Sequence, residues 1–309
     1  MADPVSTPKV SIALCVYNGA AHLREQLDSL LAQQHAPLEI IASDDASSDA
    51  SAAILAEYAA RDTRLKVLCN SQNLGFSANF AQTLSGCTGD FICPSDQDDV
   101  WHPEKITRLL AAIGDHDLAY CDSLMVDATG RSLGRRLSQD RAMYSGRDPL
   151  VFVLTNCISG HAMLFRRSLV LRALPMPAAL YYDWWLAIVA ACGQGVVYVD
   201  APLVQFRRHD RTVTTLGGVQ QRAGIGMRAF LVERLHLLAA ISSLPSPRQA
   251  DAARLEKQLK QWLDQGSGLP FVLHALRFYR PLLHPLRPRL AKVAGQSLKY
   301  WLALFRKPT

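Results

Sequence analysis

Short apolar runs alternate with amphipathic stretches over the first part of the chain. The β-branched run at 10–16 predicts a buried strand, and leucines spaced three and four residues apart predict a helix over about 20–34. The same alternation continues with strands at 38–42, 65–68 and 90–94 and helices at 51–61, 73–84 and 103–113. Strands and helices that alternate at this spacing are typical of a parallel sheet with crossover helices. The pattern therefore predicts an α/β fold.

The second half of the chain has a different pattern. It predicts a hairpin at 124–133, a mobile polar loop at 134–148, an apolar helix at 181–192, and strands at 118–121, 157–165, 196–199 and 203–206. From about residue 219 the periodicity is only helical, with helices expected at 220–243, 248–264, 270–283 and 289–305. We therefore expect an α/β domain over 8–215 and a helical, basic extension over 216–309.

A polar cluster follows each of the first four predicted strands. They are Tyr17-Asn18, Asp44-Asp45, Asn73 to Asn79 and Asp96 to Asp99. In open parallel sheets, ligands bind beyond the carboxyl ends of the strands. Four polar clusters at such ends predict a binding site along that edge.

The most acidic cluster, Ser-Asp-Gln-Asp-Asp-Val-Trp at 95–101, carries three carboxylates within four positions. Such crowding is unfavourable because like charges repel and burial disfavours the charged form, and a divalent cation would offset both effects. Hard oxygen ligands suit Mg²⁺ or Mn²⁺. Two interpretations follow: an Asp-x-Asp site for a metal and a diphosphate, or an acidic turn that caps the next helix.

Composition indicates an ordinary globular protein, with 309 residues of which 49% are hydrophobic and 19% charged. The net charge of +6 is concentrated late in the chain, because the residues after Asp264 include eight Lys or Arg and no Asp or Glu. No apolar run approaches the roughly 20 residues of a spanning helix, and residues 1–9 lack the apolar segment of a secretory signal. The seven scattered cysteines predict reduced core residues of a cytoplasmic protein.

The order and spacing of the motifs resemble the inverting family 2 glycosyltransferases of the GT-A fold over about residues 9–215. The motifs are Val-Ser-Ile-Ala-Leu-Cys-Val-Tyr-Asn (10–18), Ser-Asp-Asp-Ala-Ser-Ser-Asp (43–49), Asn-Leu-Gly-Phe-Ser-Ala-Asn (73–79), Asp-Gln-Asp-Asp-Val-Trp (96–101), Asp-Trp-Trp-Leu-Ala (183–187) and Phe-Arg-Arg-His (206–209). Their form looks most like the rhamnosyltransferase branch of polysaccharide or O-antigen assembly. The resemblance implies an α/β GT-A fold with a mostly parallel central sheet, here followed by the α-helical extension.

The resemblance also implies roles for individual residues. Asp183 would be the base that takes the proton from the acceptor hydroxyl, and Asp98 and His209 would hold Mg²⁺ or Mn²⁺. The nucleotide-sugar donor would contact Val16, Tyr17, Asn18, Asp45, Gly75, Asn79, Asp96, Arg207 and Arg208. The acceptor side would include Trp101, Gly160, His161 and Trp184.

Several of these residues could instead have a purely structural role. Asp45 and Asp183 could cap helices, and Trp101 could belong to the core. Asp99 is expected to cap the helix that follows residues 95–101. The resemblance therefore gives testable positions, and the geometry of the site has to decide between the roles.

The expected function is metal-dependent, inverting sugar transfer from a nucleotide diphosphate to a glycan or glycolipid, with dTDP-rhamnose as the favoured donor. A UDP-hexose or N-acetylhexosamine transferase, or an enzyme that makes polyprenyl-phosphate sugars, is the first alternative. A non-catalytic glycan-binding or scaffold protein is the second. The basic, aromatic-rich tail suits either peripheral contact with an anionic membrane or packing on the catalytic domain, and nucleic-acid binding is not expected.

Overall fold

The computed structural model describes residues 7–177, 180–208, 226–266 and 268–286. The chain divides into two compact units. One unit comprises residues 1–137, 158–186 and 197–209, and the other comprises 138–157, 187–196 and 210–309. The predicted domain boundary at 215–216 lies outside the described residues.

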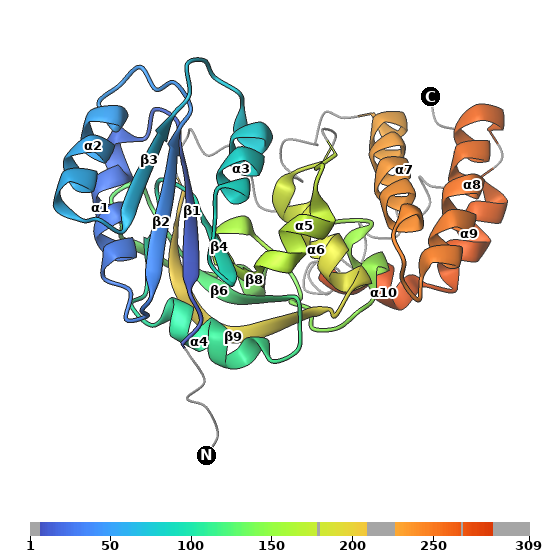
Figure 1. The fold of residues 1–309 in the computed structure, drawn as a ribbon. Coiled ribbons are helices and arrows are strands. Elements are labelled where there is room, and N and C mark those ends of the chain that lie inside the picture. Colours follow the sequence, from blue (N-terminus) through green and yellow to red (C-terminus); the bar gives the residue numbers. More distant parts are fainter. Residues whose placement is uncertain (1–6, 178–179, 209–225, 267, 287–309) are drawn as a thin grey trace. The chain divides into compact units, whose positions relative to one another are not determined.

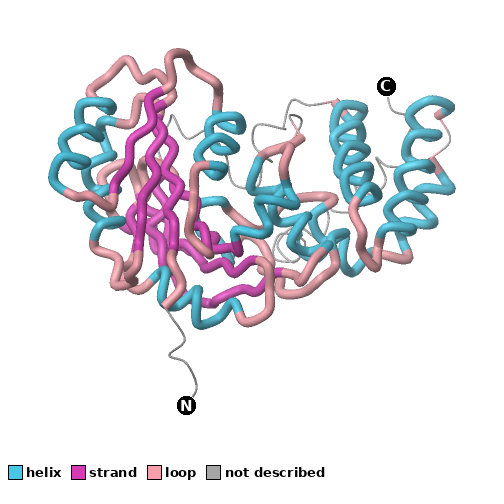
Figure 2. The backbone as a smooth tube through the Cα atoms, viewed as in Figure 1, coloured by secondary structure: helices cyan, strands magenta, loops and turns pink. Residues whose placement is uncertain are grey.

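The first unit is built on a mixed sheet whose strands run in the order β3-β2-β1-β4-β8-β6-β9-β5, with β7 paired to β6 (Figures 1 and 2). The strands are β1 (Val10–Val16), β2 (Leu38–Asp44), β3 (Leu65–Cys69), β4 (Phe91–Ser95), β5 (Val100–Trp101), β6 (Leu118–Val126), β7 (Ser132–Arg136), β8 (Met163–Arg166) and β9 (Val196–Arg207). Strands β3, β2, β1 and β4 are parallel, which confirms the predicted α/β winding. Strand β8 pairs antiparallel with β4 and β6.

Helices cover both faces of the parallel strands (Figure 1). On these strands they are α1 (Ala20–Leu31), α2 (Ser51–Arg61) and α3 (Phe76–Ser85). Helix α4 (Lys105–Ile113) packs on β6 and β8, α5 (Arg167–Ala173) packs on β8, and α6 (Tyr182–Cys192) follows later in the chain. Alternate residues of β1 point to opposite faces, as strand geometry requires. Ile12 and Leu14 join the core that includes leucines of α1, whereas Cys15 lies 3.3 Å (Sγ to Oγ1) from Thr83 of α3. The carboxyl ends of β1, β2 and β4 consequently share one edge.

The second unit is mainly helical. It contains α7 (Met227–Ser243), α8 (Gln249–Gln265), α9 (Leu269–Leu276) and α10 (Tyr279–Leu283), with α8 packed against both α7 and α9. Arg248 at the start of α8 forms a 2.9 Å ion pair with Asp148, which ties the segment 138–157 to the helices. Among the helices that the structure describes, none combines the length and apolarity needed to span a membrane.

Several predicted elements have different limits in the structure. The strand expected at 157–165 is confined to Met163–Arg166, because the 3-10 turn η3 (Gly160–Ala162) occupies the preceding residues. The two strands expected at 196–199 and 203–206 are one strand, since β9 continues through Ala201 and Pro202. The polar loop expected at 134–148 includes the end of β7 and buries Leu137. The helix expected at 289–305 lies outside the described residues.

Candidate active site

The loops after β1, β2 and β4 meet at the shared edge of the sheet, as predicted. The backbone N–H of Asp45 donates to the carbonyl of Val16 at 2.8 Å. The N–H of Tyr17 donates to Gln97 Oε1 at 2.7 Å, and Gln97 Nε2 donates back to the Tyr17 carbonyl at 3.0 Å. Asn18 adopts φ 51°, a left-handed conformation that asparagine tolerates. The predicted donor residues at these three strand ends are therefore neighbours.

Asp45 organises the loop that leads into α3. Its buried carboxylate accepts hydrogen bonds from the N–H groups of Leu74 (2.8 Å) and Gly75 (2.9 Å) and from Asn70 Nδ2 (2.8 Å). Gly75 needs its glycine identity because φ 82° and ψ 162° suit only that residue. Asn79 is also buried, and its Oδ1 accepts from Asn70 at 3.1 Å. Three predicted donor-binding positions thus form one bonded network at the edge.

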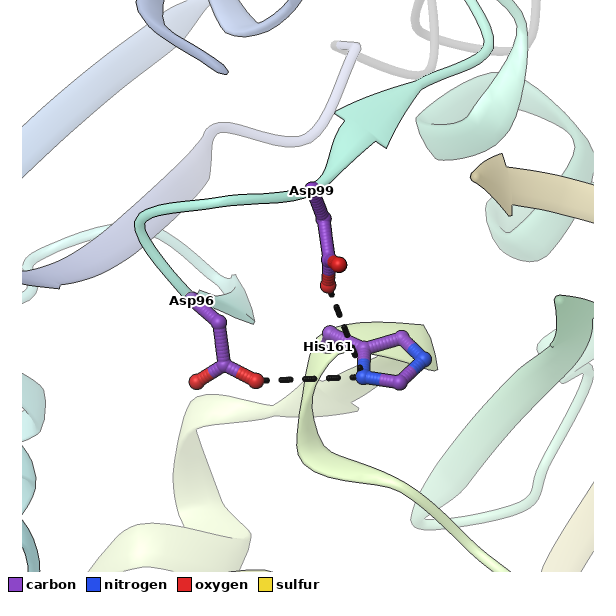
Figure 3. A group of neighbouring side chains, drawn as sticks. All are labelled: Asp96, Asp99 and His161. Atoms are coloured by element: carbon purple, nitrogen blue, oxygen red, sulfur yellow. Dashed lines mark ion pairs between the residues drawn. The ribbon is translucent and has the colours of Figure 1, made fainter. Parts of the chain in front are cut away.

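An acidic cluster, defined here as Asp96, Asp99 and His161, lies beside these loops (Figure 3). The two carboxylates come from the segment between β4 and β5 and point toward the imidazole of η3. His161 Nδ1 lies 3.8 Å from Asp96 Oδ2 and 3.6 Å from Asp99 Oδ2. One ligand atom of each residue lies within 4.8 Å of the others, so the three side chains could hold a metal ion.

The electrostatics of the acidic cluster favour a cation. Asp99 is 1% exposed, and burial together with the charges of Asp98 and Asp96 raises its pKa well above the ordinary range. Its Oδ1 accepts the backbone N–H of Arg207 at 3.0 Å, whereas its buried Oδ2 has no hydrogen-bond partner among the described residues. Burial lowers the pKa of His161, so its uncharged form, which can ligate a metal, is favoured. The residues present therefore fit a divalent cation.

His161 is held by contacts on several sides. Its Nε2 lies 2.9 Å from Ser123 Oγ, and its ring stacks on Phe206 with 4.7 Å between the ring centroids. Lys105 Nζ donates to the His161 carbonyl at 2.5 Å and lies 3.0 Å from the centroid of Trp101. Burial lowers the pKa of Lys105 to about 8. A buried ammonium thus supports the backbone of the candidate ligand.

The structure gathers a different candidate metal set from the one expected. Asp98 and His209 were the predicted ligands, whereas the acidic cluster consists of Asp96, Asp99 and His161, a histidine expected on the acceptor side. The backbone carbonyl of Asp98 accepts from Arg207 Nε at 2.8 Å. His209 lies outside the described residues. Asp99, expected as a helix cap, is instead a cluster member, since α4 begins after Glu104 without a side-chain cap.

Three other residues predicted to contact donor or acceptor make contacts within the protein. Arg207 is 2% exposed, and besides Asp98 its guanidinium donates to the Ala128 carbonyl at 3.1 Å and pairs with Glu25 at 2.5 Å. Through these bonds Arg207 connects the turn at 96–99 to Ala128 and Glu25. Trp101, expected on the acceptor side, is 2% exposed and belongs to the core. The backbone N–H of Arg208 donates to the Val126 carbonyl at 2.9 Å.

Asp183 lies in the first turn of α6 and is half-buried. Its Oδ1 accepts the backbone N–H of Trp184 at 2.7 Å, a contact of the capping kind, and Trp184 itself is buried. Burial, followed by the charges of Asp96 and Asp183, raises the pKa of the neighbouring Tyr182 well above its usual value. Tyr182 is thus within electrostatic range of both the acidic cluster and the predicted base.

Gly160 is essential to the placement of Tyr182. A Cβ at position 160 would lie 1.9 Å from the Tyr182 hydroxyl oxygen. The tyrosine ring is buried and stacks on Phe80 with 4.0 Å between centroids. Gly160, expected to leave room on the acceptor side, therefore leaves room for a tyrosine.

Sequence reasoning missed three residues of the site: Lys105, Ser123 and Tyr182. Ser123 is a polar position in the apolar, buried strand β6, and such a position signals a required partner. Lys105 follows the exposed residues His102, Pro103 and Glu104, so no local pattern marks it as buried. Tyr182 precedes the predicted base, at a position where many members of the resembled family have a second acid, and no role was expected for the tyrosine itself.

Three comparisons relate the chain to known proteins. The model of glycosyl transferase family 2 matches residues 11–172, more than half of the chain. An uncharacterized Mycobacterium tuberculosis protein is 28% identical over 244 residues, which cover 75% of this chain and 66% of that protein. EpsH of Bacillus subtilis, named as a glycosyltransferase, is 29% identical over 215 residues, covering 66% of this chain and 62% of EpsH. The chain thus spans less than two thirds of EpsH and about two thirds of the mycobacterial protein.

Solved structures share the fold at low sequence identity. Residues 1–349 of S. aureus TarS, in complex with UDP-GlcNAc, align with a TM-score of 0.60 at 17% identity, covering 96% of this chain and 88% of that chain. The mannosyltransferase PcManGT of Pyrobaculum calidifontis, in complex with GDP-Man and Mn²⁺, aligns with a TM-score of 0.54 at 17% identity, covering 98% and 85%. These similarities show the GT-A fold.

Proposed function

This chain belongs to glycosyl transferase family 2, and we propose that it transfers a sugar from a nucleoside diphosphate donor to a glycan or lipid-linked acceptor with inversion. The observation that carries the proposal is the acidic cluster at the carboxyl edge of the sheet, where Asp99 has a buried oxygen without a hydrogen-bond partner among the described residues. A diphosphate and a cation would together neutralise that charge.

The donor in this proposal contacts the strand-end loops. Exposed Tyr17 and the backbone around Gly75 supply surface and close approach, while Val16, Asn18, Asp45 and Asn79 shape the edge. Fold neighbours that bind UDP-GlcNAc and GDP-Man support a nucleotide-sugar donor. We propose dTDP-rhamnose as the favoured donor, because the motif Ser-Asp-Gln-Asp-Asp-Val-Trp at 95–101 resembles that of rhamnosyltransferases. UDP-hexoses, UDP-N-acetylhexosamines and polyprenyl-phosphate acceptors are the alternatives to test.

The cation in this proposal is Mg²⁺ or Mn²⁺, held by Asp96, Asp99 and His161. When bound, it supplies positive charge that stabilises the leaving nucleoside diphosphate. Asp98 lies in the same turn. Asp98 and His209 are the alternative ligand pair expected from the sequence, and substituting them tests that alternative against the acidic cluster. In this proposal Arg207 holds the turn at 96–99 in place through its hydrogen bonds to Asp98 and Asp99.

Asp183 is the proposed base. Inverting transfer needs one group to take the proton from the acceptor hydroxyl as that oxygen attacks the anomeric carbon. A half-buried carboxylate at the start of α6, next to Tyr182 whose pKa is raised by burial and by the charges of Asp96 and Asp183, suits this role. Gly160 and Trp184 would border the acceptor side, and the buried Tyr182 would keep Asp183 at a fixed place relative to the cluster.

We propose that the protein is cytoplasmic and contacts an anionic membrane through α9 and α10. Leu269, Leu273 and Leu276 share one face of α9 and are between 44% and 58% exposed, and Tyr279 follows at 49%. The residues after Asp264 carry eight basic and no acidic side chains, which complements anionic lipid. This surface would bring the enzyme to a lipid-linked acceptor.

Sedimentation with phosphatidylcholine vesicles, with and without phosphatidylglycerol, tests the membrane proposal. Binding should require the anionic lipid and be lost in a Leu273→Ser, Leu276→Ser double variant. Leu171→Ser is the matched control because Leu171 is 69% exposed on α5. Equal binding by the double variant would contradict the proposed surface.

Nucleotide release from a panel of nucleotide sugars tests the catalytic proposal. We expect release with one donor class, dependence on Mn²⁺ or Mg²⁺, and suppression by a chelator. Donor binding without turnover for any acceptor would support a non-catalytic glycan-binding protein instead.

A further inference from the structure

The two ring nitrogens of His161 face different partners. Nδ1 lies 3.6 Å from Asp99 Oδ2 and 3.8 Å from Asp96 Oδ2, and both distances exceed the usual hydrogen-bond length of about 2.7–3.2 Å. Nε2 lies 2.9 Å from Ser123 Oγ, which is a normal hydrogen-bond length. The imidazole thus makes its short contact on the side away from the carboxylates.

The ring is fixed in this orientation. It is 3% exposed, and it lies nearly parallel to Phe206, with 4.7 Å between centroids and 15° between planes. Lys105 Nζ holds the carbonyl of the same residue at 2.5 Å. Because the ring and the backbone are both held, Nε2 stays toward Ser123 and Nδ1 toward the acids.

The partner of one ring nitrogen decides what the other can do. A neutral imidazole carries one proton, and a histidine that ligates a metal usually donates its other N–H to a fixed acceptor. When Nε2–H donates to Ser123 Oγ, the lone pair of Nδ1 points toward Asp96 and Asp99. Without the serine hydroxyl, the proton would be more stable on Nδ1, between the two carboxylates, where it would block that lone pair.

We propose that Ser123 is a positioning residue for the cation site formed by Asp96, Asp99 and His161. This inference rests on the cation dependence in the proposed function. Ser123 lies in β6 and is fully buried, so it acts through His161 and touches neither cation nor substrate.

The test compares Mn²⁺ affinity of the full chain with that of Ser123→Ala, by calorimetry in the presence of a nucleoside diphosphate. Loss of a partner of this kind weakens metal binding roughly 10–100-fold. Activity should return at high Mn²⁺, so that the apparent KM for Mn²⁺ rises while kcat is retained. Ser11→Ala is the matched control, because Ser11 is a fully buried strand serine whose Oγ donates to Glu39 at 2.6 Å. That control should lose stability and keep its Mn²⁺ affinity.

A second measurement needs no folded variant at position 123. Spectra of the unsubstituted protein labelled with ¹⁵N-histidine report which nitrogen of His161 carries the proton when Mg²⁺ is saturating, with His161→Gln used for assignment. We expect the proton on Nε2, and a proton on Nδ1 would overturn the inference.

The outcomes separate this inference from the proposed function. If His161→Ala loses Mn²⁺ binding while Ser123→Ala binds within about twofold of the unsubstituted protein, the positioning role is wrong and the cation site stands. If the unsubstituted protein binds no Mn²⁺ even with a nucleoside diphosphate present, the cation site is wrong and the inference fails with it.

Discussion

The close fit between Gly160 and Tyr182 makes Gly160→Ala an informative perturbation of the site. The added Cβ would lie 1.9 Å from Oη and 2.7 Å from Cζ of the tyrosine, well inside a normal contact of about 3.5 Å. The ring cannot easily move away, because it is 2% exposed and stacks on Phe80 at 4.0 Å. Overpacking typically costs about 1–3 kcal/mol, and two contacts this short against a fixed ring favour the upper end, about 3 kcal/mol.

Urea denaturation of four proteins measures this effect: the unsubstituted chain, Gly160→Ala, Tyr182→Phe and the double variant. Removing the hydroxyl deletes the 1.9 Å contact and leaves the 2.7 Å contact, so Tyr182→Phe should recover part of the loss in the alanine background. We expect a coupling free energy of about 1 kcal/mol or more. Gly86→Ala is the control, since its Cβ would meet nothing closer than 3.5 Å.

Two results would refute the reasoning. Gly160→Ala could be as stable as the unsubstituted chain, or the double-variant cycle could show no coupling. Either result would mean that the tyrosine ring does not fill the space beside Gly160. Mn²⁺ affinity of Gly160→Ala should also fall, because residue 160 directly precedes the candidate ligand His161.

Three further substitutions probe the base, the cluster and the sheet. Asp183→Asn should lower kcat by about 10²-fold or more with donor KM unchanged, and a kcat within tenfold of the original would contradict its role as base. Asp99→Asn should weaken Mn²⁺ binding yet raise Tm without metal, because the raised pKa of Asp99 means that its ionised form destabilises the fold; a fall in Tm would contradict this. Burial alone would raise the pKa of Glu39, but hydrogen bonds from Lys9, Ser11 and Thr88 lower it from 4.5 to about 2, so its ionised form adds stability above pH 4.5 that is lost as the pH falls toward 2. Glu39→Gln should therefore cost roughly 3 kcal/mol at pH 7 and little near pH 2, as measured by denaturation at both pH values.

The parallel strands and their helices could be predicted from the sequence because their hydrophobic periodicity is local. Apolar β-branched strands and leucine-spaced helices give periods of 2 and 3.6, and every predicted element from β1 to α4 is present. The helix at 51–61 has the predicted limits. The later strands were harder, because η3 and the continuous β9 depend on pairing with distant segments.

The site was predictable in location and less so in detail. The strand-end rule identified the edge where Asp45, Gly75 and Asp96 lie. Which carboxylate meets His161 depends on the turn at 96–99, whose geometry is set by the backbone contacts of Arg207 with Asp99 and Asp98. Those contacts join residues more than 100 positions apart, and no local pattern encodes them.

The location of the bound cation tests the central claim most directly. Anomalous diffraction from crystals grown with Mn²⁺ and a nucleoside diphosphate would identify the ion without reference to activity. We predict one ion held by Asp96, Asp99 and His161, with the diphosphate bound next to it. An ion bound elsewhere, or undiminished sugar transfer in the presence of a chelator, would contradict the account.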